Sequence, residues 1–585
     1  MFSTSASRLP AAAVVGLALA TGGTARAQEP DVTVSGRVQS DIRFRLTEAT
    51  VGGWYNELEL PSGVARNENL AGLTVEAGMD DVSAVADIDL VLYGLSNDID
   101  GLGALARREE VDPYRFDIHQ LYFQVQDLLV DGLDLRVGQQ LVMWGVGDQF
   151  NPTNNINPDD LEDPLRFGDQ AGNVMARLDY WINEEWSLTG VLVPVFKPAL
   201  LPRTAPLGVA RLDRVPIIDD DLRLRVQAEN AASGMSILNH PTIVASTSHE
   251  LPDTSFENMQ FAYRIGGNLF GHDLSLSYYR GRWDLPVARA NHTIQNATPQ
   301  CNPNRPTECV DGTLETDVLL TYPKMHVYGF NATGEISWLR EISEVFSSIG
   351  YRLEGALMVP QQQRLRLTND ELNIAFPQPA GEYDYDDDGQ PGGREPLVVD
   401  DTPFLKWVFG LDYTFGEHVY ANVQWVHGLV DEYGAGDFIT EGWQVVAADV
   451  TTDATDTTLG CALNRDGTEC VREIQRPKIN DYLVVGVDLR FLENRALVRI
   501  FNILYLNGVW IEQFDPARGQ RVREHKSIAT EEGFSMVIFP EVSYNFGNGL
   551  ELAGGALVQL GKDYSRFGDP QGGGSLAWTR GRYSF

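Results

Sequence analysis

Residues 32–46 read VTVSGRVQSDIRFRL, and this stretch decides the fold class. Its even positions are apolar or small, and its odd positions carry polar or charged side chains such as Arg37 and Arg43. An alternation with a period of two predicts a β-strand with one apolar and one polar face. Strands of soluble sandwiches usually span about five or six residues, whereas a tilted strand that crosses a membrane needs about 9–11. The length of this stretch favours the membrane strand.

The same pattern recurs along the chain, for example at 404–415, 481–491 and 534–546. We count about 18 such strands (16–18), the tenth beginning near residue 317, and the connections between them alternate between tight turns and long segments. Short periplasmic turns with long external loops are typical of outer-membrane barrels, and closure is required because open sheet edges leave backbone groups unpaired in lipid. We therefore predict an all-β fold: a single transmembrane antiparallel β-barrel.

The two ends of the chain agree with export to the outer membrane. Arg8, the apolar run 11–20 and the small residues around Ala27 predict a signal peptide over residues 1–27. Residues 28–585 then form the barrel. The terminal Phe585, with Tyr583 two residues earlier, resembles the last strand of bacterial outer-membrane proteins, which implies recognition by the barrel-assembly machinery.

Charge and cysteine content narrow the partners. A formal net charge of -37 excludes nucleic acid, whose phosphates need a basic surface. The four cysteines fall into two local pairs, and in an exported chain these predict disulfides; they are Cys301 with Cys309, and Cys461 with Cys470. Neither segment contains a histidine, so a metal site there is disfavoured.

The alternation of apolar and polar positions along each predicted strand indicates which side chains face the lumen. Both signs of charge occur on that face, so charge selectivity stays open between a solvated wall cross-linked by ion pairs and a ladder that selects substrates. The arginines that we expect along the pore are Arg37, Arg43, Arg136, Arg177, Arg264, Arg352 and Arg490. The loops 145–172 and 197–258 are candidates to fold inward, where Trp144, Phe150 and Asn157 would either line a constriction or pack the rim.

One segment carries a family resemblance. Gly138-Gln139-Gln140 is followed by Trp144-Gly145, by Asn151-Pro152, and by the strand end 194–198, Pro-Val-Phe-Lys-Pro. Over residues 115–205 this resembles an uncharacterised family of bacterial outer-membrane barrels, a domain of unknown function, and more distantly the alginate-export-type porins. Gln139 and Val146 stand where that family usually has Arg and Glu. The resemblance implies a channel for small or apolar molecules.

An acidic loop fits a calcium-binding pattern. Residues 384–395 match the spacing of a calcium loop in full, with a glycine at the sharp turn. The predicted ligands are Asp384, Asp386, Asp388, Gln390 and Glu395. Against this, no helix is predicted on either side and Pro391 lies inside the loop; the alternative is a solvated acidic turn.

The sequence favours a porin-like channel in the bacterial outer membrane, in contact with lipid and lipopolysaccharide and passing a small-molecule cargo. Two alternatives stay open: a barrel enzyme such as a lipid hydrolase, and an adhesin or structural barrel that works through its loops. The nine histidines are scattered and form no recognisable catalytic or metal-spaced motif, which argues against an enzyme.

Overall fold

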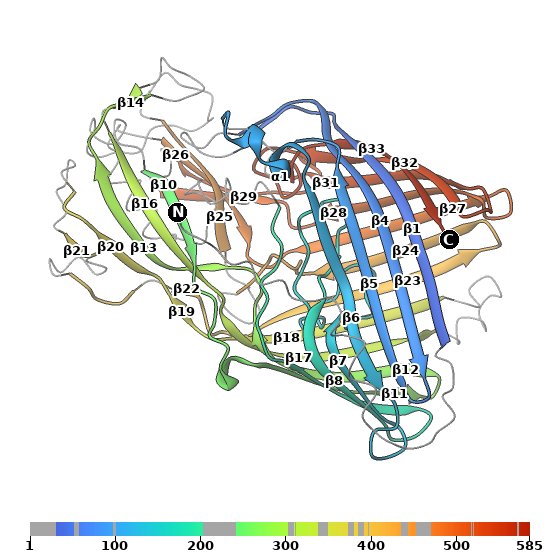
Figure 1. Ribbon diagram of the computed structural model, residues 1–585. Helices are drawn as coiled ribbons and strands as arrows, with labels where there is room; N and C mark the ends of the chain where they lie inside the picture. Colours follow the sequence, from blue (N-terminus) through green and yellow to red (C-terminus); the bar gives the residue numbers. More distant parts are fainter. Residues whose placement is uncertain are drawn as a thin grey trace, which may run out of the picture.

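A closed antiparallel β-barrel forms the body of the protein (Figure 1). The computed structural model describes residues 31–51, 58–96, 101–202, 242–301, 309–310, 312–336, 349–372, 380–383, 391–395, 397–434, 443–451, 470–515, 518, 520–569 and 572–585. Its largest sheet has 18 strands, each antiparallel to its neighbours, and the first strand pairs with the last. The fold class and the strand number expected from the sequence are confirmed.

The barrel strands follow one another around the wall in chain order. They are β1 (Asp31–Arg45), β4 (Gly63–Met79), β5 (Val82–Tyr93), β6 (Tyr114–Val125), β7 (Leu133–Gln140), β8 (Asn173–Trp181), β9 (Trp186–Val193), β11 (Gln260–Leu269), β12 (His272–Arg282), β17 (Lys324–Glu335), β18 (Gly350–Pro360), β23 (Phe404–Phe415), β24 (Val419–His427), β27 (Asp481–Phe491), β28 (Ala496–Tyr505), β31 (Ser535–Asn545), β32 (Leu550–Gly561) and β33 (Leu576–Ser584).

Alternation along each strand separates an outer apolar face from an inner face of mixed character. In β1 the even-numbered Val34 and Phe44 are exposed, whereas Asp41 and Arg43 between them are buried inside the barrel. The same outward exposure of large apolar side chains recurs around the wall. A continuous apolar exterior is what lipid requires and what water disfavours.

Tight turns join the strands at one end. The β11–β12 connection is Phe270-Gly271, and both residues have positive φ (56° and 83°). This geometry matches the right-handed twist of the two strands, and it favours glycine at the second position. Phe270 is 91% exposed at this end, as expected for an aromatic residue of an interfacial girdle.

The tenth strand lies later in the chain than the sequence suggested. Residues 313–321 form β16 (Thr313–Thr321), which belongs to a second sheet outside the barrel, and the barrel strand is β17. Apolar and polar side chains alternate in both segments, and Tyr322-Pro323 separates them. Periodicity alone cannot tell which of two adjacent strands joins the barrel, so the prediction of a barrel strand from residue 317 was wrong.

The long connections build two sheets at the other end (Figure 1). One sheet has the order β10-β16-β13-β20-β21, with β10 (Thr242–His249), β13 (Val287–Asn296), β20 (Arg366–Asn369) and β21 (Gly381–Glu382). The other has the order β25-β26-β29-β30, with β25 (Trp443–Thr451), β26 (Cys470–Pro477), β29 (Val509–Asp515) and β30 (Gln520–Lys526). Three two-stranded sheets complete the described β-structure, formed by β2 (Ala49–Val51) with β3 (Leu58–Leu60), β14 (Gln300–Cys301) with β15 (Cys309–Val310), and β19 (Gln363–Arg364) with β22 (Leu397–Val399).

Helix is confined to α1 (Arg108–Val111) and two single turns, η1 (Ala104–Ala106) and η2 (Phe256–Asn258), in the described part of the chain. None of the described helices is long and apolar enough to cross a bilayer.

Three expectations fall wholly or partly outside the described residues. Residues 1–27, the expected signal peptide, are among them. So are four of the expected calcium ligands, Asp384, Asp386, Asp388 and Gln390; only Glu395 is described. Cys301 is disulfide-bonded and lies opposite Cys309 in the β14–β15 pair, whereas Cys461 is outside the described residues and its bond to Cys470 stays a prediction.

Candidate functional site: the inner loop and the cavity beside it

The connection between β7 and β8, residues 141–172, folds into the barrel; we call it the inner loop. Glu354 of β18 holds its first part. One carboxylate oxygen of Glu354 accepts hydrogen bonds from the backbone N–H groups of Val146 (2.7 Å) and Gly147 (2.9 Å), and the other accepts from Thr153 N (2.8 Å) and Oγ1 (2.8 Å). Glu354 is fully buried, so these four bonds replace the water that the carboxylate loses.

Two amide side chains of the wall extend this attachment. Gln424 of β24 accepts a hydrogen bond from Asp148 N (2.9 Å) and donates one to Asp148 O (3.2 Å). Asn331 of β17 donates to Trp144 O (2.8 Å). Three neighbouring or near-neighbouring strands therefore hold residues 144–153 through the loop backbone.

The second half of the inner loop is fixed to the opposite part of the wall. Arg43 of β1 binds both carboxylate oxygens of Asp163, at 2.5 and 2.8 Å, and also Asp41 at 2.8 Å. Burial alone would raise the pKa of Asp163, but the hydrogen bonds and charge of Arg43 outweigh burial and lower it. Glu162 contacts Arg115 of β6 at 3.1 Å. Because its attachments lie on both sides, the loop crosses the lumen.

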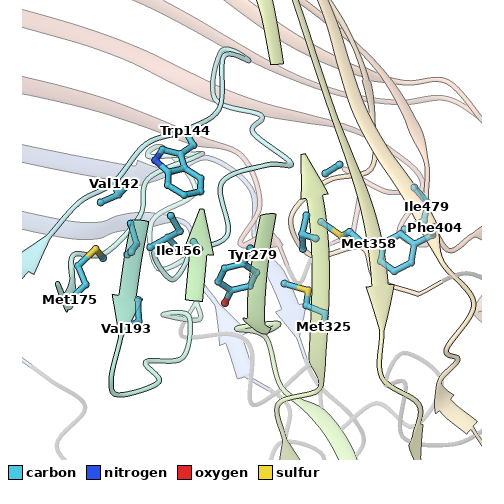
Figure 2. Packing of buried hydrophobic residues seen from close by; sticks show 14 residues of the cluster. Val142, Trp144, Ile156, Met175, Val193, Tyr279, Met325, Met358, Phe404 and Ile479 are labelled. Carbon is cyan, nitrogen blue, oxygen red and sulfur yellow. The ribbon is translucent and has the colours of Figure 1, made fainter. Parts of the chain in front are cut away.

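Apolar side chains pack the inner loop against the wall between β8 and β23. Trp144 and Ile156 contact the inner face of the strands that carry Val193, Tyr279 and Met325 (Figure 2). Trp144 is 3% exposed. This packing buries the strand face that would otherwise line water, so this side of the barrel is filled rather than open.

Two carboxyl groups meet where the loop passes the end of β12. Asp159 N donates to Asp284 Oδ2 (2.7 Å), and Asp159 Oδ1 accepts from Gln170 Nε2 (3.0 Å). Burial and then the neighbouring negative charge of Asp284 raise the pKa of Asp159 well above its ordinary value. Repulsion between the two carboxyl groups is therefore smallest while Asp159 carries a proton.

A cavity of about 310 Å³ lies on the other side of the inner loop. Asp148, Gln149 and residues 165–167 of the loop form one side of it, and β1, β24, β27, β28, β31, β32 and β33 form the other. Its lining is aromatic and charged; the aromatic members are Phe167, Tyr420, Phe501, Phe539 and Trp578. A second cavity of about 40 Å³, lined partly by Asn157 and Lys406, lies behind the loop.

Most charges around the larger cavity are paired. Arg499 binds both oxygens of Asp488 at 2.7 Å, and Arg166 lies 3.6 Å from Asp163, the carboxylate that Arg43 holds. Within the described part of the chain, Glu541 has no hydrogen bond or ion pair. Arg580 likewise lacks both and instead lies over the ring of Trp578, 4.8 Å from its centre. The side chain of Asp148 has only a weak contact with Asn422, at 3.5 Å.

Elsewhere on the inner wall, several of the predicted arginines form ion pairs. This is the pattern expected of a solvated wall cross-linked by ion pairs. Arg37 binds Asp89 (2.6 Å), Arg177 binds Asp179 (2.8 Å), Arg352 binds Asp412 (2.9 Å), and Arg490 lies 3.9 Å from Asp488. Arg136 lies 5.7 Å from the centre of the Tyr122 ring. Of the arginines predicted to line the pore, only Arg43 lines the cavity; Arg264, like the others, does not.

The inner loop was expected to fold inward, and it does, but none of Trp144, Phe150 and Asn157 lines the larger cavity. Trp144 packs against the wall, and Asn157 holds the loop to itself by donating to Gln140 O (2.9 Å) and Ala171 O (3.1 Å). Phe150 packs on the ring of Phe167. The described end of the other candidate loop, residues 242–249, lies in the outer sheet as β10, and residues 203–241 are outside the described residues.

Sequence reasoning missed Arg499, Glu541 and Asp148. In β28, apolar residues occupy both faces around Arg499, so the period of two is weak there. Asp148 lies in a loop and has no period. The sequence signal that was available is the acidic and basic content of 145–172.

No family model and no curated protein matches the chain. Among solved structures it is similar to OccAB3 of Acinetobacter baumannii, at 8% identity and a TM-score of 0.39 over 94% of this chain and 99% of that one. It is also similar to OpdL of Pseudomonas aeruginosa, at 10% and 0.37 over 95% and 98%. OmpT, an outer membrane protein of Vibrio cholerae, matches at 8% and 0.32 over 96% and 99%. Similarities this distant carry no argument about function.

Proposed function

We propose that the protein is a porin-like channel of the bacterial outer membrane, and that small molecules pass through the cavity between the inner loop and strands β24 to β33 and β1. The observation that carries this proposal is the cavity itself. An 18-stranded barrel encloses more space than its own side chains fill, and the inner loop fills only one side of it. What is left is a cavity with a charged and aromatic lining, which we propose as the passage.

The exterior of the barrel supports the membrane location. Large apolar side chains are exposed around the wall, and an exposed apolar surface of this extent is unstable in water. The proposal includes export by residues 1–27, contact with outer-membrane lipid, and insertion through the C-terminal strand. It also includes the resemblance of residues 115–205 to an uncharacterised barrel family, since that segment is the one that forms the inner loop.

The free charges of the cavity indicate a mild preference for cations. Among the cavity-lining charges that form no ion pair with a described residue, two are negative, Asp148 and Glu541, and one is positive, Arg580. The aromatic lining would suit cargo with a flat apolar part, because stacked rings gain dispersion and quadrupole contacts. Loop 384–395 remains a proposed calcium site.

Planar-bilayer recording tests the channel. We expect stable single-channel steps and a small excess of cation permeability in a salt gradient. Arg580→Gln should raise the ratio of cation to anion permeability, and Glu541→Gln should lower it. Arg582→Gln is the matched control, because Arg582 is paired with Glu551 (3.1 Å) and does not line the cavity. A folded, inserted protein that passes no current would refute the proposal.

A further inference from the structure

The outer face of β12, β17 and β18, together with residues 257–259 before β11, carries a groove of about 560 Å³ near the end of the barrel that bears the long connections. Residues on these strands stand in register across the face: Phe261 lies opposite Arg280, Arg280 opposite His326, and His326 opposite Val359. The alternation places the even-numbered residues of β12 and β17 outward, because Ser275 and Tyr279, and likewise Met325 and Val327, are buried inside. Arg280, Lys324 and His326 therefore face away from the lumen.

The rungs of this face change in character along the barrel. Leu276 and Phe330 form an apolar rung, and two residues further along each strand Tyr278 and Tyr328 pack on each other with ring centres 5.3 Å apart. The next rung carries Arg280 and His326, and the Tyr278 hydroxyl bonds to His326 Nδ1 at 2.9 Å. The order is therefore apolar, then tyrosine, then cation.

The distance along the strand puts the cations at the edge of a bilayer. Phe270 marks the short-turn end of β12, ten residues before Arg280. At about 3.3 Å per residue and a strand tilt of about 40°, Arg280 lies about 25 Å above Phe270. That height equals the typical apolar band of an outer-membrane barrel, about 25 Å. The groove therefore opens at the level of lipid headgroups.

The cations of the groove are available to a ligand. Arg282 is engaged, since it donates to Tyr322 O (2.6 Å) and to Asn258 Oδ1 (2.9 Å). Arg280 and Lys324, in contrast, have no side-chain hydrogen bond or ion pair with any residue that the structure describes. Two carboxylates, Glu257 and Asp401, also line the groove, beyond the external ends of the barrel strands.

This concentration of cations is local. The outward-facing side chains at the external ends of β5 and β6 are Leu92, Tyr114 and Phe116, all exposed and none basic. The groove thus differs from this other part of the rim in chemistry, not only in shape.

We propose that this groove binds the phosphorylated headgroup of an outer-leaflet lipid, with Arg280 and Lys324 on the phosphate and the Tyr278–Tyr328 pair against the start of the acyl region. The proposal rests on the membrane location given under the proposed function. Guanidinium and ammonium groups at the edge of an apolar band are suited to phosphate, and tyrosine rings favour the boundary between lipid and water. The ligand class is a phosphorylated glycolipid of the lipopolysaccharide type.

Native mass spectrometry of the detergent-folded full chain tests the site, with bisphosphorylated lipid A as the probe. We expect the wild type to retain the lipid, and Arg280→Gln/Lys324→Gln to bind it at least tenfold more weakly. Arg495→Gln is the control, since Arg495 is an exposed cation at the short-turn end of the barrel, and it should bind as the wild type does. Heat-modifiable migration shows whether each variant is folded, and the single variant Lys324→Gln replaces the double variant if that one does not fold.

Three results would overturn the lipid site: equal affinity in the double variant, equal affinity for dephosphorylated lipid A, or equally tight binding of inorganic phosphate titrated alone. Conductance of the same preparations in phosphatidylcholine bilayers separates this failure from failure of the channel. Loss of lipid discrimination with normal current in all variants refutes the lipid site only, whereas a folded wild type that passes no current refutes the proposed function.

Discussion

Replacing Glu354 by Gln should release part of the inner loop. Glu354 uses both carboxylate oxygens to accept four hydrogen bonds, three of them from backbone N–H groups. Gln keeps one oxygen and replaces the other by an NH₂ group, which cannot accept. Because the Thr153 hydroxyl can turn to accept from that NH₂ group, the best orientation keeps the bonds from Val146 and Gly147 and leaves only Thr153 N–H facing another donor.

Leaving one buried donor unpaired costs about 1–3 kcal/mol, so the attachment of residues 146–153 should weaken by about that amount. Because about 1.4 kcal/mol is a factor of ten, the ratio of detached to attached loop should rise by roughly 5-fold to 140-fold. The rest of the loop should stay in place, since Arg43 still holds Asp163 and the apolar packing around Trp144 is untouched.

Amide hydrogen exchange in the folded protein measures this directly. The amides of Val146, Gly147 and Thr153 should lose protection by that factor, while barrel amides keep theirs. Single-channel current should become noisier as the loop fluctuates beside the cavity. Glu551→Gln, which removes an inner-wall carboxylate far from the loop, is the matched control. Unchanged protection of the three amides in folded Glu354→Gln would refute the reasoning that Glu354 anchors the loop.

Three further outcomes are expected. The loop should be held less firmly at Asp159 as the pH rises through the raised pKa of Asp159, because an acid whose pKa is raised on folding stabilises the folded state only while protonated; Asp159→Asn should reduce the pH dependence of amide protection at residues 159–160, leaving the part due to Asp284, whose pKa is also raised, and an unchanged dependence would refute the role of Asp159. Reduction should leave the β-sheet circular dichroism intact, since the Cys301 disulfide lies in a hairpin outside the barrel and closes a short loop worth about 3 kcal/mol or less; a collapse of the spectrum on reduction alone would contradict this placement. Detergent-folded protein should migrate differently on gels before and after boiling, because all 18 strands are paired on both sides, and identical migration would count against a closed barrel.

The lining of the passage could be predicted only in part. Arg43 was identified because apolar and polar side chains alternate without interruption in β1. This alternation shows that Arg43 faces the lumen. Arg499 was not, because β28 has apolar residues on both faces. The outward apolar side chains of β28 face the exterior, and the inward ones, Phe501 and Ile503, belong to the apolar cluster around Tyr482. Where the interior of a barrel is itself apolar, the contrast that a period of two relies on disappears.

Local sequence patterns are sufficient to predict the barrel. Side chains in a strand alternate between two faces, lipid demands one of them apolar, and an unpaired edge is too costly in a membrane. These local rules predict the number of strands and which connections form the short turns at one end of the barrel. Contacts between distant parts of the chain set which of β16 and β17 joins the wall, and where the inner loop lies. Its course depends on bonds such as Glu354 to Val146 and Arg43 to Asp163, between residues more than a hundred positions apart. No periodic pattern encodes such contacts, because each of them arises only once the barrel has closed and brought distant strands to face one another.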